Sequence, residues 1–241
     1  MKKILLGIAV VIVLAVGGGA WWLYSSLDSL VASAIRQYGP EITGVSVKIS
    51  SVKIVVADGA ATLRGLVVGN PQDFKTNHAL SLGEIDMKLD IASLTKDVIV
   101  IKQIAIVSPE ITYEYGAGGS NLDAIQRNVD RYVAAHLGSR DQPRDRSGGK
   151  KLIIESLSIR NAKANVSAAV LQGKATAVAV PDVQLRDIGK KTNGATAGEA
   201  TKQILGALMQ NVVKATASLN LGGAVDTLKQ GAGDKLKGLF K

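Results

Sequence analysis

Two histidines and a row of acidic residues are the side chains that could do acid–base or metal chemistry. His78 and His136 are far apart in the sequence, and neither has a second ligand at a spacing typical of a metal site. Glu84, Asp86 and Asp90 look like carboxylates paired for general acid–base catalysis. They alternate with aliphatic residues, however, as the wet face of a β-strand does. Strand periodicity explains the row, so we predict that the protein is not an enzyme.

The other motifs of catalysis and cofactor binding are missing from the sequence. There is no cysteine, which excludes disulfides, thiolate metal sites and cysteine nucleophiles. The glycine-rich segment 116–119 lacks the strand-to-helix context of a phosphate-binding loop. No G-x-S-x-G, P-loop or H-E-x-x-H motif occurs. We therefore expect no catalytic residue, no metal and no cofactor, and we keep a membrane-associated enzyme only as a distant third reading.

The first residues indicate export. Lys2 and Lys3 precede a stretch from Ile4 to Leu27 without a charged residue, which is long enough to span a bilayer as a helix. Trp21, Trp22 and Tyr24 close the stretch, where residues of a membrane interface are expected. The two lysines favour a cytoplasmic N-terminus. A retained anchor is favoured over a cleaved secretory signal, because the apolar run is long and Gly-Gly-Gly-Ala-Trp-Trp is a poor cleavage site.

Composition limits the core and the partners. Apolar residues make up 46% of the chain and aromatic residues only 4%, so the core must be built mainly from Val, Ile, Leu and Ala. The net charge of +9 suits nucleic acid or an anionic membrane surface, and equally a solvated face. Export makes a nucleic-acid partner unexpected.

From Val45 onward the hydrophobic period is two, which predicts strands. A change in the parity of the apolar residues near Ser50 predicts a bulge or a bend, and a second change at Gly83 predicts a bulge. Asp58-Gly59 predicts a hairpin turn. Short connections predict mainly antiparallel pairing. The predicted structural turn residues, at strand exits and interruptions, are Gly65, Gly69, Asn70, Pro71 and Pro109.

Helical spacing appears in three further places. Leu27, Leu30, Ala34 and Tyr38 predict a short helix before Gly39-Pro40, either continuing the anchor or resting at the membrane surface. Asn121 is the expected N-cap of a helix that ends near Leu137. The predicted C-terminal helices carry apolar stripes at 204–215 and 225–240. The second of these is basic and suits either an anionic membrane or the dry face of the sheet.

The fold class is therefore α+β: an N-terminal transmembrane helix, a curved and mostly antiparallel sheet, and C-terminal helices. The predicted parts are 1–24 as a transmembrane signal-anchor, 25–40 as a connecting helix, 41–137 as an N-terminal β-region with a helix, 138–151 as a flexible loop, 152–190 as a second β-region of the same sheet, and 191–241 as a helical region. A curved sheet with one apolar face must be covered by helices, by a second sheet or by a ligand with apolar chains.

The order of several short motifs resembles one family. These motifs are Val45–Ile49, Gly65–Pro71 with Phe74, Ser93-Leu94, Val100-Ile101, Pro109–Ile111, Tyr113-Glu114 and Asn121-Leu122. Together they resemble the N-terminal region of the AsmA-like bacterial envelope proteins, over roughly Lys2 to Val133 and less closely to Gly189. The chain is a short member by this reading, so a bridge across the whole periplasm is not expected of it.

The resemblance implies a single-pass protein of the bacterial inner membrane with its bulk in the periplasm and a groove akin to that of chorein-type lipid carriers. The implied function is binding or handling of phospholipid in lipid homeostasis of the outer membrane and envelope. The alternative is a structural or partner-binding envelope scaffold without lipid cargo. Expected partners are the inner membrane, phospholipid and other envelope proteins. The predicted groove residues are Ile85, Met87, Leu89, Ile91, Ile104 and Ile106.

Overall fold

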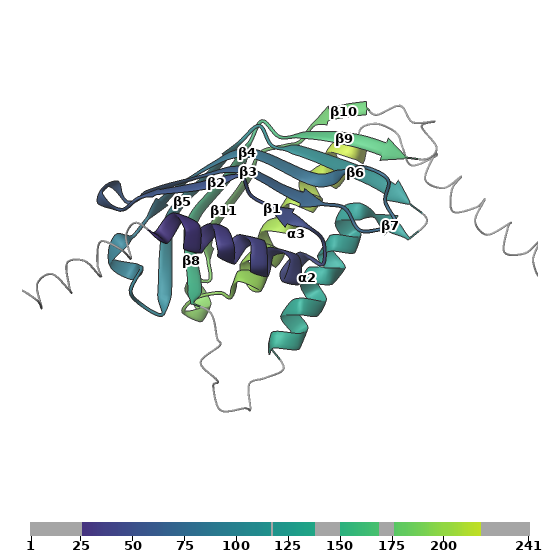
Figure 1. Ribbon diagram of the computed structural model, residues 1–241. Coiled ribbons are helices and arrows are strands. Elements are labelled where there is room, and N and C mark those ends of the chain that lie inside the picture. Colours follow the sequence, from purple (N-terminus) through teal and green to yellow (C-terminus); the bar gives the residue numbers. More distant parts are fainter. Residues whose placement is uncertain (1–25, 117, 138–149, 169–175, 218–241) are drawn as a thin grey trace, which may run out of the picture.

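A single curled β-sheet forms an arch, and three helices lie beneath it (Figure 1). The computed structural model describes residues 26–116, 118–137, 150–168 and 176–217. The predicted transmembrane segment, with Trp21, Trp22 and Tyr24, lies outside the described residues, as do most of the predicted loop at 138–151 and the predicted helix at 225–240.

The elements follow in chain order. A helix at residues 26–43 comes first. The strands are β1 (Val47–Lys48), β2 (Ser51–Val55), β3 (Ala60–Gly69), β4 (His78–Leu89), β5 (Val98–Val107), β6 (Glu110–Gly116), β7 (Gly119–Ser120), β8 (Lys151–Arg160), β9 (Lys163–Ala168), β10 (Thr176–Ala179) and β11 (Val183–Ile188). The other helices are α2 (Asn121–Leu137), α3 (Ala197–Ala217) and the short 3-10 turns η1 (Val56–Asp58), η2 (Ile91–Ser93) and η4 (Lys190–Thr192).

Several of these strands are halves of longer ones. β5 and β6 pair with β4 in a single register, since Ile106 lies opposite Ile85 and Ile111 opposite Leu80. In the same way β8 and β9 pair with β5 and β6 in a single register. The strands β11 and β10 pair with β8 and β9 in a single register. The strands β1 and β2 pair with β3 in a single register. The described sheet thus consists of six long, bent strands and the short β7.

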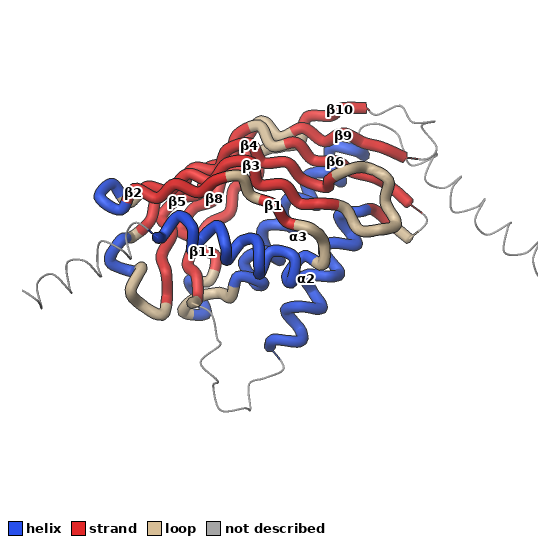
Figure 2. Tube along the Cα trace, in the orientation of Figure 1, coloured by secondary structure: helices blue, strands red, loops and turns tan. Residues whose placement is uncertain are grey.

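The interruptions of these strands align across the sheet. The register of the flanking residue pairs shows that one interrupted residue of each long strand lies in a single row across the sheet, which we call the crease. Its members are Ser50, Gly65, Gly83, Ser108, Asn161 and Pro181. Three of these residues have a positive φ: Gly65 (65°), Ser108 (54°) and Asn161 (55°). A left-handed residue rotates the chain, so the apolar side chains change parity there. All the long strands therefore bend at the same level, which curls the sheet into the arch seen in Figure 2.

The parity change at Gly83 is a bend and not the predicted bulge. The pairing of β3 with β4 keeps one register on both sides of this residue, and Ile85 and Leu80 keep one register with β5 and β6. The register shifts lie at Val68/Gly69 and at Lys88/Leu89. The expected interruptions at Ser50 and Pro109 are confirmed, and a further one lies at Pro181.

The sheet is mixed rather than mostly antiparallel. β8 pairs with β5 and β9 pairs with β6 in parallel, at the centre of the sheet. The reason is the connection: α2 intervenes between β6 and β8, and a crossover helix returns the chain in its original direction. The expectation that 152–190 joins the same sheet is confirmed.

Local sequence explains where α2 and α3 begin. Ser120 and Asp123 form reciprocal bonds at the start of α2: the Ser120 backbone donates to the Asp123 carboxylate, and the Asp123 backbone donates to the Ser120 hydroxyl. Thr196 and Glu199 repeat this capping box at the start of α3. The N-cap predicted at Asn121 is therefore one residue late. The first helix also continues past Gly39-Pro40 to residue 43, beyond its predicted end.

Candidate functional site

The inner face of the curled sheet, which looks toward the helices, is aliphatic in every long strand. One row of cross-strand partners is closed to solvent from edge to edge: Val52, Leu63, Ile85, Ile106, Ile159 and Val183, each no more than 8% exposed. We call it the closed row. Because it crosses all six strands without a polar residue, it forms the centre of the core.

A second row runs beside the first, two residues nearer the strand ends at η1 and η2. Its members are Ile54, Ala61, Met87, Ile104, Leu157 and Leu185. Three of them, Ile54, Met87 and Leu185, are only partly buried and pack against the core from its margin. We call it the marginal row, because here the aliphatic inner face reaches solvent.

The helices supply most of the cover of this face. The buried residues of α3 include Leu205, Leu208 and Val212, and those of α2 include Ile125 and Val129. All five belong to the same core cluster as the closed row. The apolar stripe predicted from Ile204 to Ala215 thus packs in the core or against it.

The predicted groove residues share this inner face but differ in access. Ile85, Ile104 and Ile106 are buried at 6%, 9% and 6% exposure. Met87 and Leu89 are partly buried at the margin of the core. Ile91 follows the end of β4 and lies in the turn η2, so the strand predicted to reach it is two residues shorter. Met87 and Leu89 are therefore the members of the set that combine an inner-face position with partial exposure on a strand.

The first helix is fastened to the edge strand at the level of the marginal row. The Ile54 backbone N–H donates to the Asp28 carboxylate at 2.8 Å, and the Arg36 guanidinium donates to the Ile49 carbonyl at 3.1 Å. These bonds satisfy backbone groups that an edge strand would otherwise leave open. They also place the start of the helix, and hence the point where residues 1–25 join the body, next to the marginal row.

The predicted turn residues at the end of β3 act as a structural clamp. Asn70 donates from its amide to the Thr76 carbonyl at 2.8 Å and also bonds the Thr76 hydroxyl. Glu114 accepts from the backbone N–H groups of Lys75 and Thr76, both at 2.8 Å. Phe74 turns back so that its ring approaches Gly116. The Gly-Asn-Pro break is therefore architecture: it ends β3 and holds the return loop on β6.

Two titratable groups of this clamp region have shifted pKa values. Partial burial raises the pKa of Glu114. The hydrogen bonds from Thr76 and from the backbone of Lys75 together lower this pKa by more than burial raises it, so the net pKa is below the ordinary value. Burial raises the pKa of the Tyr113 hydroxyl. Both shifts follow from structural bonds and burial.

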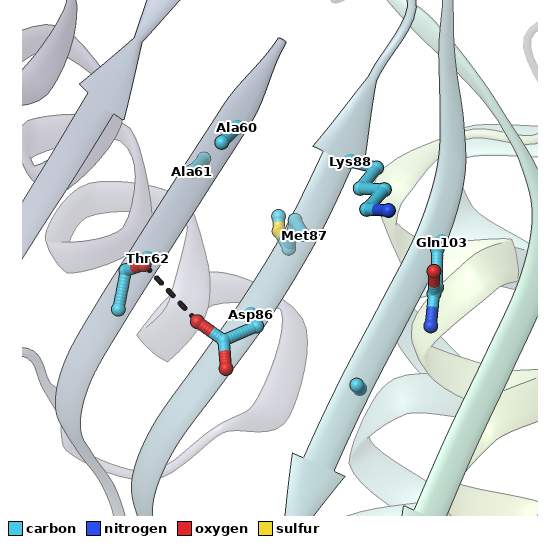
Figure 3. A pocket seen from close by; sticks show the side chains of 8 residues that line it. Ala60, Ala61, Thr62, Asp86, Met87, Lys88 and Gln103 are labelled. Atoms are coloured by element: carbon cyan, nitrogen blue, oxygen red, sulfur yellow. Dashed lines mark hydrogen bonds between the residues drawn. The ribbon is translucent and has the colours of Figure 1, made fainter. Parts of the chain in front are cut away.

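The outer face of the sheet carries the acidic row and an open hollow of ≈190 Å³ (Figure 3). Each carboxylate of the row has a structural partner: Glu84 pairs with Arg64 at 2.7 Å, Asp86 accepts from Thr62 at 3.1 Å, and Asp90 accepts from the Ala92 backbone. The small side chains of Ala60 and Ala105 leave the space. Within the described ranges, no group of three His, Cys, Asp or Glu side chains could hold a metal ion.

Comparison with known proteins leaves the chain without an assigned family. No protein-family model matches it, and no curated protein is significantly similar to it. Among the helices of the described residues, none is both long and apolar enough to cross a bilayer. The fold itself defines the class that can be stated: an α+β protein with a curled, mixed sheet over three helices.

Proposed function

We propose that the protein is an AsmA-like envelope protein, held in the bacterial inner membrane by its first residues, that handles phospholipid on the periplasmic side. In this proposal an acyl chain is received at the marginal row, between the sheet and the first helix. Phospholipid and the inner membrane are its partners, and it carries out no covalent chemistry.

One observation carries the proposal: the aliphatic inner face reaches solvent at Met87 and Leu89, and the marginal row that contains Met87 ends at Ile54, which bonds the start of the first helix. Where a buried aliphatic face opens at its margin, an acyl chain can pack against the exposed carbon atoms and remove them from water. Each methylene group buried in this way contributes about 0.8 kcal/mol to the free energy of binding. The margin is also where residues 1–25 join the body, since Asp28 bonds Ile54 there. An anchor entering at this point would bring the margin toward the membrane.

A second candidate function is an envelope scaffold without lipid cargo. It is favoured by the closed row and by Leu205, Leu208 and Val212, because the protein's own helices already fill most of the arch. A sheet filled in this way needs no ligand for its stability. The two candidates differ in whether lipid is bound at the margin.

The test is native mass spectrometry of residues 25–241, expressed with a cleavable secretion signal and purified without detergent, followed by lipid extraction. Stoichiometric phospholipid is the expected result. The double substitution Met87→Gln and Leu89→Gln places amides at the margin with little change in side-chain length, so we expect it to remove the lipid while the far-UV spectrum is unchanged.

Lys88→Gln is the matched control, because Lys88 lies between the two residues and points to the outer face. It should leave the lipid in place. A stable, monodisperse wild-type protein that carries no lipid would reject the carrier proposal and favour the scaffold. Unchanged lipid content in a folded double variant would reject the margin as the site.

A further inference from the structure

The apolar residues of the first helix extend beyond the side that meets the core. The core side packs through Val31, Ala32, Ile35 and Ile42. Beside it on the same helix, Leu30 is 50% exposed and Tyr38 is 49% exposed. Ala34, midway between them, is also exposed, and Leu27 continues the line half-buried. These residues recur at intervals of three and four, so they form one stripe, which we call the outer stripe.

Few charges lie near the outer stripe. Between residues 26 and 40 the charged residues are Asp28 and Arg36. Both are bonded to backbone groups of the edge strand, at Ile54 and Ile49. From residue 26 to residue 40 the outer stripe is therefore flanked on its exposed side by uncharged polar residues, and the exposed Glu41 lies at its end.

The exposure is concentrated on this helix within the described part of the chain. Large hydrophobic side chains are strongly exposed there at four positions: Leu30, Tyr38, Val107 and Val213. Val107 and Val213 are isolated on β5 and α3, whereas Leu30 and Tyr38 lie on one helix with Ala34 between them. Single exposed apolar residues need no explanation, but an uncharged stripe does.

The chain preceding the helix indicates what covers the stripe. Residues 4–27 contain no charge and are long enough to span a bilayer, and they lead directly into residue 26. The first turn of the helix thus begins where such a span would leave the hydrocarbon. Figure 2 shows this helix at the front of the molecule, on the outside of the helical layer.

We propose that the outer stripe of the helix at residues 26–43 lies in the interface of the same membrane that holds residues 1–25, so that the helix is an interfacial foot for the whole arch. Leu27, Leu30 and Ala34 enter the boundary between headgroups and acyl chains, and Tyr38 lies at headgroup level, as tyrosine does at membrane interfaces. This inference rests on the proposed function for the presence of the anchor. It adds the orientation of the body: with its first helix flat on the bilayer, the edge strand β2 and the marginal row stand next to the lipid surface.

The absence of cysteine from the sequence makes the test direct. The full chain is reconstituted into phosphatidylethanolamine/phosphatidylglycerol liposomes as single-cysteine variants Leu30→Cys and Tyr38→Cys. Each is labelled with a polarity-sensitive fluorophore. Val107→Cys and Val213→Cys are the controls, because their native side chains are as exposed, at 49% and 48%, but lie on other elements. We expect a blue shift and loss of emission with spin-labelled lipids at positions 30 and 38, and neither effect at 107 and 213.

Each other outcome has a separate meaning. If alkaline carbonate releases the protein from the liposomes, the anchor and with it the proposed function fail. If the protein is retained but labels at 30 and 38 respond only to a water-soluble quencher, the interfacial foot is refuted while the anchor stands. Labels at 30 and 38 that neither quencher reaches would show that a protein surface, such as a second copy, covers the outer stripe, and would also overturn the inference.

Discussion

Asn70 and Asn121 are 51 positions apart in the sequence, yet the side-chain amide of Asn121 donates to the Asn70 side-chain oxygen at 2.8 Å. The same amide donates to the Thr112 carbonyl at 2.8 Å, and the Asn121 oxygen accepts from the Glu114 backbone at 3.0 Å. Asn121 is fully buried. One side chain thus joins the exit of β3, the strand β6 and the start of α2.

Replacement of Asn121 should weaken the fold strongly. In Asn121→Asp the shape is kept, but a carboxylate oxygen replaces the amide that donates to Asn70 and Thr112. Buried acceptors would lose their donors, so we expect a loss of about 1–3 kcal/mol in the free energy of unfolding. Urea denaturation of the full chain in a mild detergent measures it. Gln103→Ala, at an exposed position of β5, is the control, and an equal loss there would show that the effect is not specific to the clamp.

The loop held by Glu114 should lose stability in acid. The pKa of Glu114 is lower in the folded protein than its ordinary value of 4.5. A lowered folded-state pKa means that the carboxylate stabilises the fold above the unfolded-state pKa, and that this contribution disappears as the pH falls through the folded-state pKa. The stability difference between wild type and Glu114→Gln should therefore be constant near neutral pH and shrink below about pH 4.5, where the unfolded carboxyl begins to bind its proton.

Urea denaturation of both proteins between pH 7 and pH 3 checks this trend. Glu110→Gln is the control, since Glu110 is exposed at the start of the same strand. A Glu114→Gln difference that stays constant down to pH 3 would contradict the assignment of the clamp to the ionised carboxylate.

Two glycines are cross-strand neighbours within the crease, and their replacement by alanine should have unequal effects on stability. Gly65 has a φ of 65°, and a Cβ there would collide with the Ser50 side chain. Gly65→Ala should therefore lower the free energy of unfolding by about 1–3 kcal/mol. Gly83 is its neighbour on β4, and a Cβ there would meet no atom within 4 Å. Gly83→Ala should change stability by no more than about 0.5 kcal/mol. Similar values for both variants would show that the crease needs no left-handed residue at 65.

No bend was predicted at Asn161, but the sequence was sufficient to locate those near Ser50, Gly65, Gly83 and Pro109, because a change of apolar parity or a Gly or Pro marks each of them within a single strand. It could not show that Ser50, Gly65, Gly83, Ser108, Asn161 and Pro181 form one line, because that depends on the register between strands. The parallel pairs were missed for a related reason: short connections predict antiparallel neighbours, and only the position of α2 between β6 and β8 reverses the rule.

The sequence predicted which side chains of the candidate site lie on the same face of the sheet, but it did not predict which of them are exposed to solvent. Alternation placed Ile85, Met87 and Leu89 on one side of β4. Whether each is sealed depends on where α3 and the first helix lie, which no pattern within β4 encodes. For the first helix, likewise, the sequence predicted the element but not which of its residues face the core. The spacing of the outer stripe predicted a helix, but the residues that face the core are Val31, Ala32 and Ile35, because Asp28 and Arg36 fix the rotation of the helix on the edge strand.

The helical cover of the arch gives a last prediction. Leu208 on α3 is 5% exposed within the core, whereas Val213, on the same helix, is 48% exposed. Leu208→Ala should leave a cavity under the sheet and lower the free energy of unfolding by about 2–5 kcal/mol. Val213→Ala should have an effect within about 0.5 kcal/mol. Urea denaturation of both variants makes the comparison. If α3 were instead a movable lid, Leu208→Ala would change stability little, and the arch would fold without it.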